Sequence, residues 1–245
     1  MRLLAQTLSY DASEIISQRQ PTELGDTLTD FTMARRNMVE NQLRPAAILD
    51  AQLLAAFDAV PREVFAPKEV QALAYVETAL QIAADRYLLA PLCLAVLLQA
   101  AEIAAGDVVL IIGAGDGYLA ALAARLAGTV IGLESDPALA VRASDRLNDA
   151  GIDNFAMVTG DLTAGCVKQA PYDVIIMNGA AQTGLTPLIG QLRQGGRLAC
   201  VEYENGVGRA RLYRGDDASA AGRTVRDLSA PILPGFEKSA AFSFG

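Results

Sequence analysis

Three glycines at alternating positions follow a run of five apolar residues, and this pairing is the clearest chemical signal in the chain. The segment Val108–Ile112 is entirely apolar, and Gly113, Gly115 and Gly117 come after it. Such a run predicts a fully buried strand, and glycines after a strand let a ligand approach the backbone. Leu119–Ala127 reads as a helix, whose amino terminus attracts negative groups. The pattern therefore predicts a nucleotide-binding loop.

The spacing of these glycines separates two classes of nucleotide. A dinucleotide fingerprint places its third glycine three positions after the second. Here Gly117 comes one place early and Tyr118 fills the expected position. The G-x-G-x-G form, with Ala114 between the first two glycines, is typical of enzymes that bind S-adenosyl-L-methionine (SAM). A nicotinamide-dependent oxidoreductase is the alternative that the spacing disfavours.

An acidic residue follows the next expected strand, Thr129–Leu133. A carboxylate at the position of Glu134 can accept both ribose hydroxyls of a nucleotide. In the alternative interpretation, Glu134 only supports the start of the following helix. Ser135 or Asp136 is expected to cap that helix, and Pro137 suits its first turn.

Polar residues also follow the third and fourth expected strands. Asp161 could hold an adenine amino group, and Leu162 could pack on the base or offer its N–H. A plain Gly160–Asp161 surface turn is the competing interpretation. Asn178 follows Tyr172–Met177 and is expected at the crevice where open α/β sheets bind ligands.

The complete absence of histidine excludes several kinds of catalysis. Ser-His-Asp and Cys-His nucleophiles, a histidine general base and histidine metal ligands are all ruled out. Cys93, Cys166 and Cys200 are far apart and form no Cys-x-x-Cys pair. This pattern predicts no metal site and fits a reducing compartment.

The charge and hydropathy of the chain disfavour two classes of partner, nucleic acids and membranes. A net charge of −8 opposes binding to nucleic acid or to anionic membranes. Residues 87–101 form the richest apolar stretch, but it is too short to span a bilayer. The amino terminus shows no basic-then-apolar signal pattern. We therefore expect a cytoplasmic protein with no nucleic-acid or membrane partner.

Strand-like and helix-like segments alternate from residue 108 onward, which predicts an α/β, doubly wound fold with a parallel sheet. The segments before it are helical. A helix at Ala51–Ala59 and another from residue 92 to 103 are expected, and a later helix is placed at about 185–192. The expected organisation is an extension at 1–30, a helical cap at 31–104, a SAM-binding core at 105–204 and a substrate-side segment at 205–245.

The chain from about residue 32 to 202 resembles the protein-L-isoaspartate O-methyltransferase family. Segments in matching order and spacing carry the resemblance: MVENQLRP (38–45), VPREVFAP (60–67), VVLIIGAGDGYLAALAA (108–124), GLESDPALA (132–140), Gly160–Asp161, APYDVIIMNGAA (170–181) and LRQGGRLACVE (192–202). The resemblance implies a Rossmann-like, SAM-dependent carboxyl methyltransferase that acts on isoaspartyl residues of damaged proteins. It also implies that the cofactor lies along residues 113–117, Glu134 and Asp161–Leu162.

One position departs from the family in a place that matters for the acceptor. Residues 87–91 read Tyr-Leu-Leu-Ala-Pro where the family has Thr-Ile-Ser-Gln-Pro, so Leu89 stands at the serine position. A leucine at the mouth of an acceptor pocket predicts weak isoaspartyl activity with SAM binding retained. The alternatives are that Leu89 is a core residue, that the acceptor is another protein carboxylate or a small molecule, or that the chain binds a partner without turnover.

Overall fold

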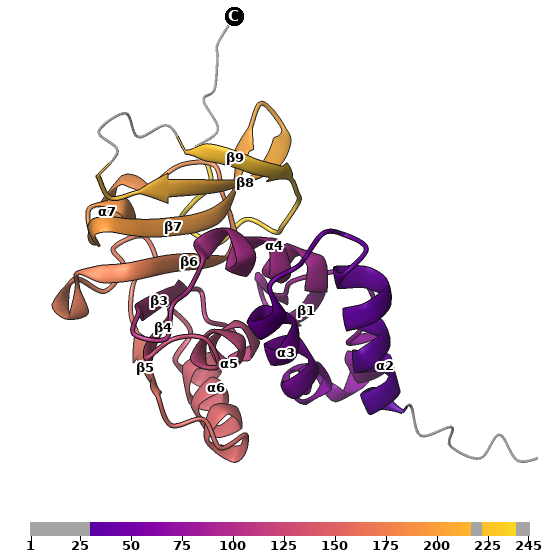
Figure 1. Ribbon diagram of the computed structural model, residues 1–245. Coiled ribbons are helices and arrows are strands. Elements are labelled where there is room, and N and C mark those ends of the chain that lie inside the picture. Colours follow the sequence, from indigo (N-terminus) through magenta and orange to yellow (C-terminus); the bar gives the residue numbers. More distant parts are fainter. Residues whose placement is uncertain (1–29, 217–221, 239–245) are drawn as a thin grey trace, which may run out of the picture. The chain divides into compact units, whose positions relative to one another are not determined.

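The computed structural model describes residues 30–216 and 222–238, and those after Asp30 belong to one compact unit (Figure 1). The expected N-terminal extension, residues 1–30, lies outside the described residues except for Asp30. The last residues of the expected substrate-side segment, 239–245, lie outside them as well.

A seven-stranded sheet forms the centre of the described unit, with strand order β5-β4-β3-β6-β7-β8-β9. The strands are β3 (Val108–Ile112), β4 (Thr129–Glu134), β5 (Phe155–Thr159), β6 (Tyr172–Ala181), β7 (Leu192–Glu204), β8 (Val207–Arg214) and β9 (Arg223–Asp227). Strands β3 to β7 pair in parallel, whereas β8 and β9 are antiparallel. The sheet is therefore mixed: the strands that alternate with helices are parallel, as predicted, and the antiparallel β8 and β9 extend the sheet at its C-terminal end.

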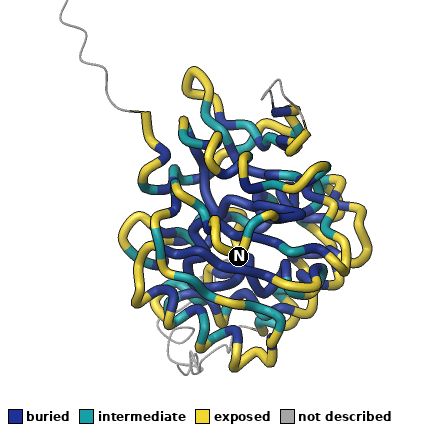
Figure 2. The backbone as a smooth tube through the Cα atoms, turned by 90° about the vertical axis from the view of Figure 1, so that its left-hand side faces the viewer, coloured by how far each residue is buried: buried dark blue, intermediate teal, exposed yellow. Residues whose placement is uncertain are grey.

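Alternate residues of β3 enter two different hydrophobic clusters, which explains why the whole strand is apolar. Val109 and Ile111 lie in a cluster with residues of α4 (Pro91–Ala101) and α5 (Tyr118–Ala124). Leu110 and Ile112 lie in a second cluster with Leu188 of α7 (Thr186–Ile189). A strand with both faces covered cannot expose polar side chains without cost. Figure 2 shows buried backbone running through the centre of the unit and exposed segments around it.

The helical elements agree with most of the expected positions. They are α2 (Phe31–Met38), a π-helical turn η1 (Val39–Leu43), α3 (Ala51–Ala59), two 3-10 segments η2 (Arg62–Phe65) and η3 (Lys68–Leu73), α4 (Pro91–Ala101), α5 (Tyr118–Ala124), α6 (Pro137–Asp149), η4 (Val167–Gln169) and α7 (Thr186–Ile189). The helix expected at 185–192 is only four residues long, because β7 already begins at Leu192.

A two-stranded hairpin interrupts the expected helical cap. Strands β1 (Leu80–Ala83) and β2 (Arg86–Leu88) pair antiparallel, with Leu80 opposite Leu88. Asp85 turns the chain between them with a φ of +53°. Strands of four and three residues are too short to show a strand period, so no sequence pattern marks this hairpin.

The three cysteines are free thiols that the structure buries. Burial raises the pKa of Cys93 to about 12, and burial also raises the pKa of Cys200. Both thiols are therefore protonated at neutral pH, and a protonated thiol is a poor nucleophile.

We predict that Cys93 and Cys200 resist alkylation in the native protein at pH 8, because their pKa values lie far above that pH. A short iodoacetamide pulse followed by peptide mass spectrometry measures this. The same pulse in concentrated urea serves as the control and should modify both residues fully. Rapid modification of Cys200 in the folded protein would contradict the burial described above.

Candidate functional site

Strands β5, β4, β3 and β6 are neighbours in the sheet (Figure 1) and run parallel, so their carboxyl ends lie at one edge. The predicted site residues lie at or just after these ends in the chain. The register aligns Ile112 with Leu133 and with Met177, and it aligns Glu134 with Thr159. The residues that follow these strands are therefore neighbours in space. This is the edge at which open α/β sheets bind their ligands.

The loop after β3 has a backbone that only glycine adopts without strain. Gly113, Gly115 and Gly117 have φ values of +72°, +58° and +93°. The N–H groups of Gly113 and Ala114 donate to the carbonyl of Leu133 at 2.9 and 3.0 Å. These bonds fix the loop against the end of β4, and Gly117 then starts α5.

Two side chains hold this glycine loop from other elements. Asn178, in β6, donates its Nδ2 to the carbonyl of Gly113 at 2.9 Å. Asp116, 2% exposed, pairs with Arg142 at 2.6 Å and with Arg146 at 2.7 Å, both from α6. Asn178 is therefore a support of the loop in this structure, 8% exposed at the crevice.

The carboxylate of Glu134 is fully buried and surrounded by N–H donors. The backbone N–H groups of Gly115, Ser135 and Asp136 donate to it at 2.9, 2.8 and 3.1 Å. Arg86, from the hairpin, adds its Nε at 3.0 Å and its Nη2 at 3.0 Å. Hydrogen bonds and an ion pair offset the cost of burying the charge.

Arg86 is the residue that the sequence analysis missed. Its Nη2 also donates to the Ser135 hydroxyl at 2.7 Å, and its Nη1 donates to the carbonyl of Asp85 at 3.0 Å. Ser135 thus binds Arg86 instead of capping α6, and Asp136 is the cap. No local pattern marks Arg86, because its partner lies 48 positions away in a different element.

Asp161 and Leu162 have very different environments. Asp161 is exposed, and its Oδ1 accepts from the hydroxyl and the N–H of Thr163 at 2.8 and 2.9 Å. These two hydrogen bonds lower the pKa of Asp161, so it is an anion at neutral pH. Leu162 is 2% exposed and belongs to the second hydrophobic cluster. Its side chain is a core contact in this structure.

Leu89 does not lie at an open pocket mouth, contrary to one expectation from the sequence. It is 1% exposed and packs in the first hydrophobic cluster. Its carbonyl accepts a hydrogen bond from the buried guanidinium of Arg62. The Cζ of Arg62 also lies over the Tyr118 ring, 5.0 Å from the ring centroid. The structure therefore favours the alternative that Leu89 is a core residue.

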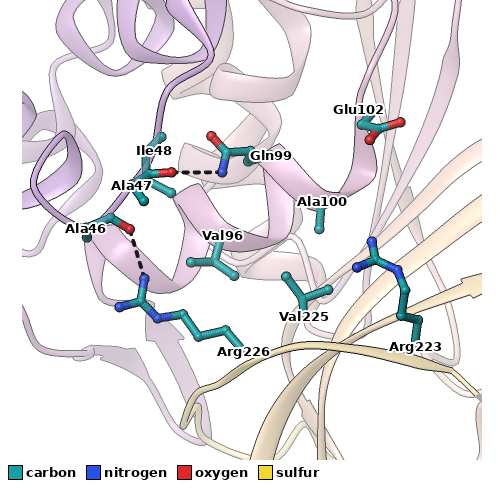
Figure 3. Close-up of a pocket in the computed structure, with 10 residues that line it drawn as sticks. All are labelled: Ala46, Ala47, Ile48, Val96, Gln99, Ala100, Glu102, Arg223, Val225 and Arg226. Atoms are coloured by element: carbon teal, nitrogen blue, oxygen red, sulfur yellow. Dashed lines mark hydrogen bonds between the residues drawn. The ribbon is translucent and has the colours of Figure 1, made fainter.

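A cavity of about 320 Å³ lies between α4, residues 46–48 and β9 (Figure 3). Arg226 donates to the carbonyl of Ala46 at 3.0 Å there, and Gln99 donates to that of Ala47 at 3.2 Å. None of the predicted site residues lines this cavity. It is separate from the crevice at the ends of β3, β4 and β6.

A model of the protein-L-isoaspartate(D-aspartate) O-methyltransferase (PCMT) family matches residues 33–225. The chain belongs to this family. The Methanoculleus marisnigri protein-L-isoaspartate O-methyltransferase is 42% identical over 164 residues, which cover 67% of this chain and 74% of that protein. The Ignicoccus hospitalis protein of the same name is 37% identical over 183 residues, which cover 74% of this chain and 86% of that protein.

Solved structures give the same fold. A protein-L-isoaspartate O-methyltransferase aligns with a TM-score of 0.71 and 24% identity over 82% of this chain and 66% of its own. A Plasmodium falciparum protein of the PCMT type, in complex with S-adenosyl-L-homocysteine, aligns with a TM-score of 0.69 and 20% identity, covering 81% and 97%. At these identities the likeness shows the fold alone, which confirms the predicted Rossmann-like methyltransferase architecture.

PCMT enzymes use SAM as their cofactor, and the residue types at the crevice fit it. The positive-φ glycines bring bare backbone to this edge of the sheet, and the Glu134 carboxylate and the Asn178 amide lie beside it. Among residues 30–216 and 222–238, no group of three or more His, Cys, Asp or Glu side chains is placed to hold a metal ion. In the same ranges, no helix has the length and apolar character to cross a membrane.

We predict that Gly115→Ala weakens binding of S-adenosyl-L-homocysteine by at least about tenfold, since the new methyl group would fill the space in front of the loop. That Cβ would lie 3.1 Å from Ile82 Cδ1 and 3.5 Å from Asn178 Nδ2. Titration calorimetry measures the affinity.

Gly151→Ala is the matched control, because Gly151 has a φ of +67° and nothing within 4 Å of its Cβ position. It carries the same kind of backbone strain, about 1–2 kcal/mol, away from the crevice. Its affinity should equal that of the wild type. Equal affinity in Gly115→Ala would show that the loop does not hold the cofactor.

Proposed function

We propose that this chain transfers the methyl group of SAM to the free carboxylate of isoaspartyl residues in proteins, as a cytoplasmic step of protein repair. Two things support the proposal. The family match covers residues 33–225, and the relatives carry the name protein-L-isoaspartate O-methyltransferase. The observation that carries it in the structure is the joining of the glycine loop, Glu134 and Asn178 at one sheet edge.

Each cofactor contact is assigned to a group at this edge. The glycine backbone of residues 113–117 faces the cofactor, Glu134 binds the ribose hydroxyls and Asp161 binds the adenine amino group. Leu162 and Ser135 lie beside these two carboxylates along the chain. When bound, SAM supplies a methyl group on a cationic sulfur that is already electrophilic.

The absence of histidine is compatible with this chemistry. A carboxylate acceptor is already ionised at neutral pH, so no side chain has to remove a proton from it. The chain's own contribution is to orient the two reactants in line and to exclude water from their opposite charges. The buried backbone of the glycine loop and the rigid ends of β3, β4 and β6 suit that task.

A family member with lost or altered activity, acting on a different acceptor or only binding a partner, is the alternative. Its main support was a leucine at the family's serine position. Leu89 is buried in this structure, but its burial does not restore the missing serine, so the transfer assay below has to separate the two. The family match favours the carboxyl methyltransferase.

We predict that the wild-type protein forms a methyl ester on a peptide that contains one isoaspartyl residue. The control peptide has the same sequence with ordinary aspartate and should remain unmodified. Transfer of labelled methyl from SAM, with S-adenosyl-L-homocysteine as the second product, is the measurement. Tight binding of S-adenosyl-L-homocysteine without any transfer to the isoaspartyl peptide would favour the alternative.

We predict that Leu89→Ser lowers the free energy of unfolding by about 2–4 kcal/mol, because it truncates a core side chain and buries a hydroxyl. Urea unfolding measures this loss. Leu49→Ser is the control, since Leu49 is 76% exposed and should change stability little. Faster turnover per folded molecule in Leu89→Ser would instead place residue 89 at the acceptor.

A further inference from the structure

The expected ribose site already contains a side chain of the protein itself. Arg86 and Glu134 are 5% and 0% exposed, and the guanidinium contacts the carboxylate through both Nε and Nη2. Three backbone N–H groups complete the surroundings of the carboxylate. A pair of ribose hydroxyls needs the same carboxylate oxygens, so the ribose and Arg86 cannot both occupy this position.

The hairpin that carries Arg86 also covers the glycine loop. Residues 113–117 are all buried. Ile82 of β1 reaches to 3.1 Å from the Cβ position of Gly115, and Leu233 reaches to 2.8 Å from that of Gly113. Arg142 adds a hydrogen bond from Nη2 to the carbonyl of Ile82 at 3.3 Å. The space in front of the loop is therefore filled by the protein's own side chains.

We propose that Arg86 competes with the ribose of SAM for Glu134, so that the cofactor binds only when Arg86 and the tip of the β1–β2 hairpin leave the crevice. The inference rests on the proposed cofactor contacts of Glu134. It assigns to Arg86 the control of cofactor affinity in this chain.

When a ribose replaces Arg86, the Glu134 carboxylate keeps hydrogen-bond donors on both oxygens. Ribose hydroxyls donate to both carboxylate oxygens, as Arg86 does, and the three backbone donors remain in place. The freed guanidinium regains water, because Ala84 and Asp85 at the tip of the hairpin are exposed. A two-stranded hairpin of this size has little stability of its own, so its position depends on such side-chain contacts. The measured affinity equals the intrinsic affinity multiplied by the fraction of molecules in which Arg86 and the hairpin tip have left the crevice.

Titration calorimetry of the full chain with S-adenosyl-L-homocysteine tests the proposal on Arg86→Gln and Arg86→Lys. Arg86→Gln should bind at least about tenfold more tightly than the wild type, because no ion pair has to be broken. Arg86→Lys keeps the charge but loses the two-pronged contact, so its affinity should fall between the two.

Arg197→Gln is the matched control. Arg197 pairs with Asp107 at 2.6 Å near the amino end of β3, the end opposite to the crevice. Its loss should leave affinity unchanged. Equal affinity in Arg86→Gln and wild type would overturn the proposal, and weaker binding would overturn it by showing that Arg86 holds the cofactor. A further outcome is that the wild type and all variants each unfold cooperatively, which shows that they are folded, and still do not bind S-adenosyl-L-homocysteine. In that case the cofactor assignment itself would be wrong, and this proposal would be overturned with it.

Hydrogen exchange on the wild type gives a second test that needs no variant. S-adenosyl-L-homocysteine should speed exchange of amides at residues 80–88 and slow exchange at residues 113–117. Slower exchange in both segments would overturn the proposal, since it would mean that the hairpin stays closed over the bound cofactor.

Discussion

A buried carboxylate needs donors on every side, and Glu134 finds them in three separate parts of the chain. The glycine loop, the start of α6 and the β1–β2 hairpin each supply N–H groups to its two oxygens. Without them the charge could not remain in a site that water does not reach. The positions of these three elements therefore depend on one another through a single side chain, and so does the shape of the cofactor crevice.

The chemistry of the PCMT family explains why such a crevice can lack histidine. A donor with an electrophilic methyl group and an acceptor that is already an anion leave the protein with the task of positioning. Backbone N–H groups, one amide side chain and carboxylates on rigid strand ends perform that task. Arg142 and Arg146 of α6 serve it indirectly, because they hold Asp116 inside the glycine loop.

Local patterns predicted the parts of the fold that carry strong periodic or turn signals. Strand β3 and helix α3 have the predicted bounds. Strand β3 is a dense apolar run, and α3 begins after Asp50, whose side chain caps it. The β1–β2 hairpin and the antiparallel β8 and β9 were missed or left undefined, because pairing between short segments is decided by tertiary contacts. Arg86 was missed for the same reason. The two interpretations of Leu89 could not be separated from the sequence, because its burial depends on elements far away along the chain.

The central claim is that Glu134 exchanges Arg86 for a ribose. A crystal structure of the chain with S-adenosyl-L-homocysteine tests this directly. We expect both ribose oxygens within hydrogen-bond distance of the Glu134 carboxylate, with the Arg86 guanidinium displaced from it. A bound cofactor with the Arg86–Glu134 pair still in place would contradict the account.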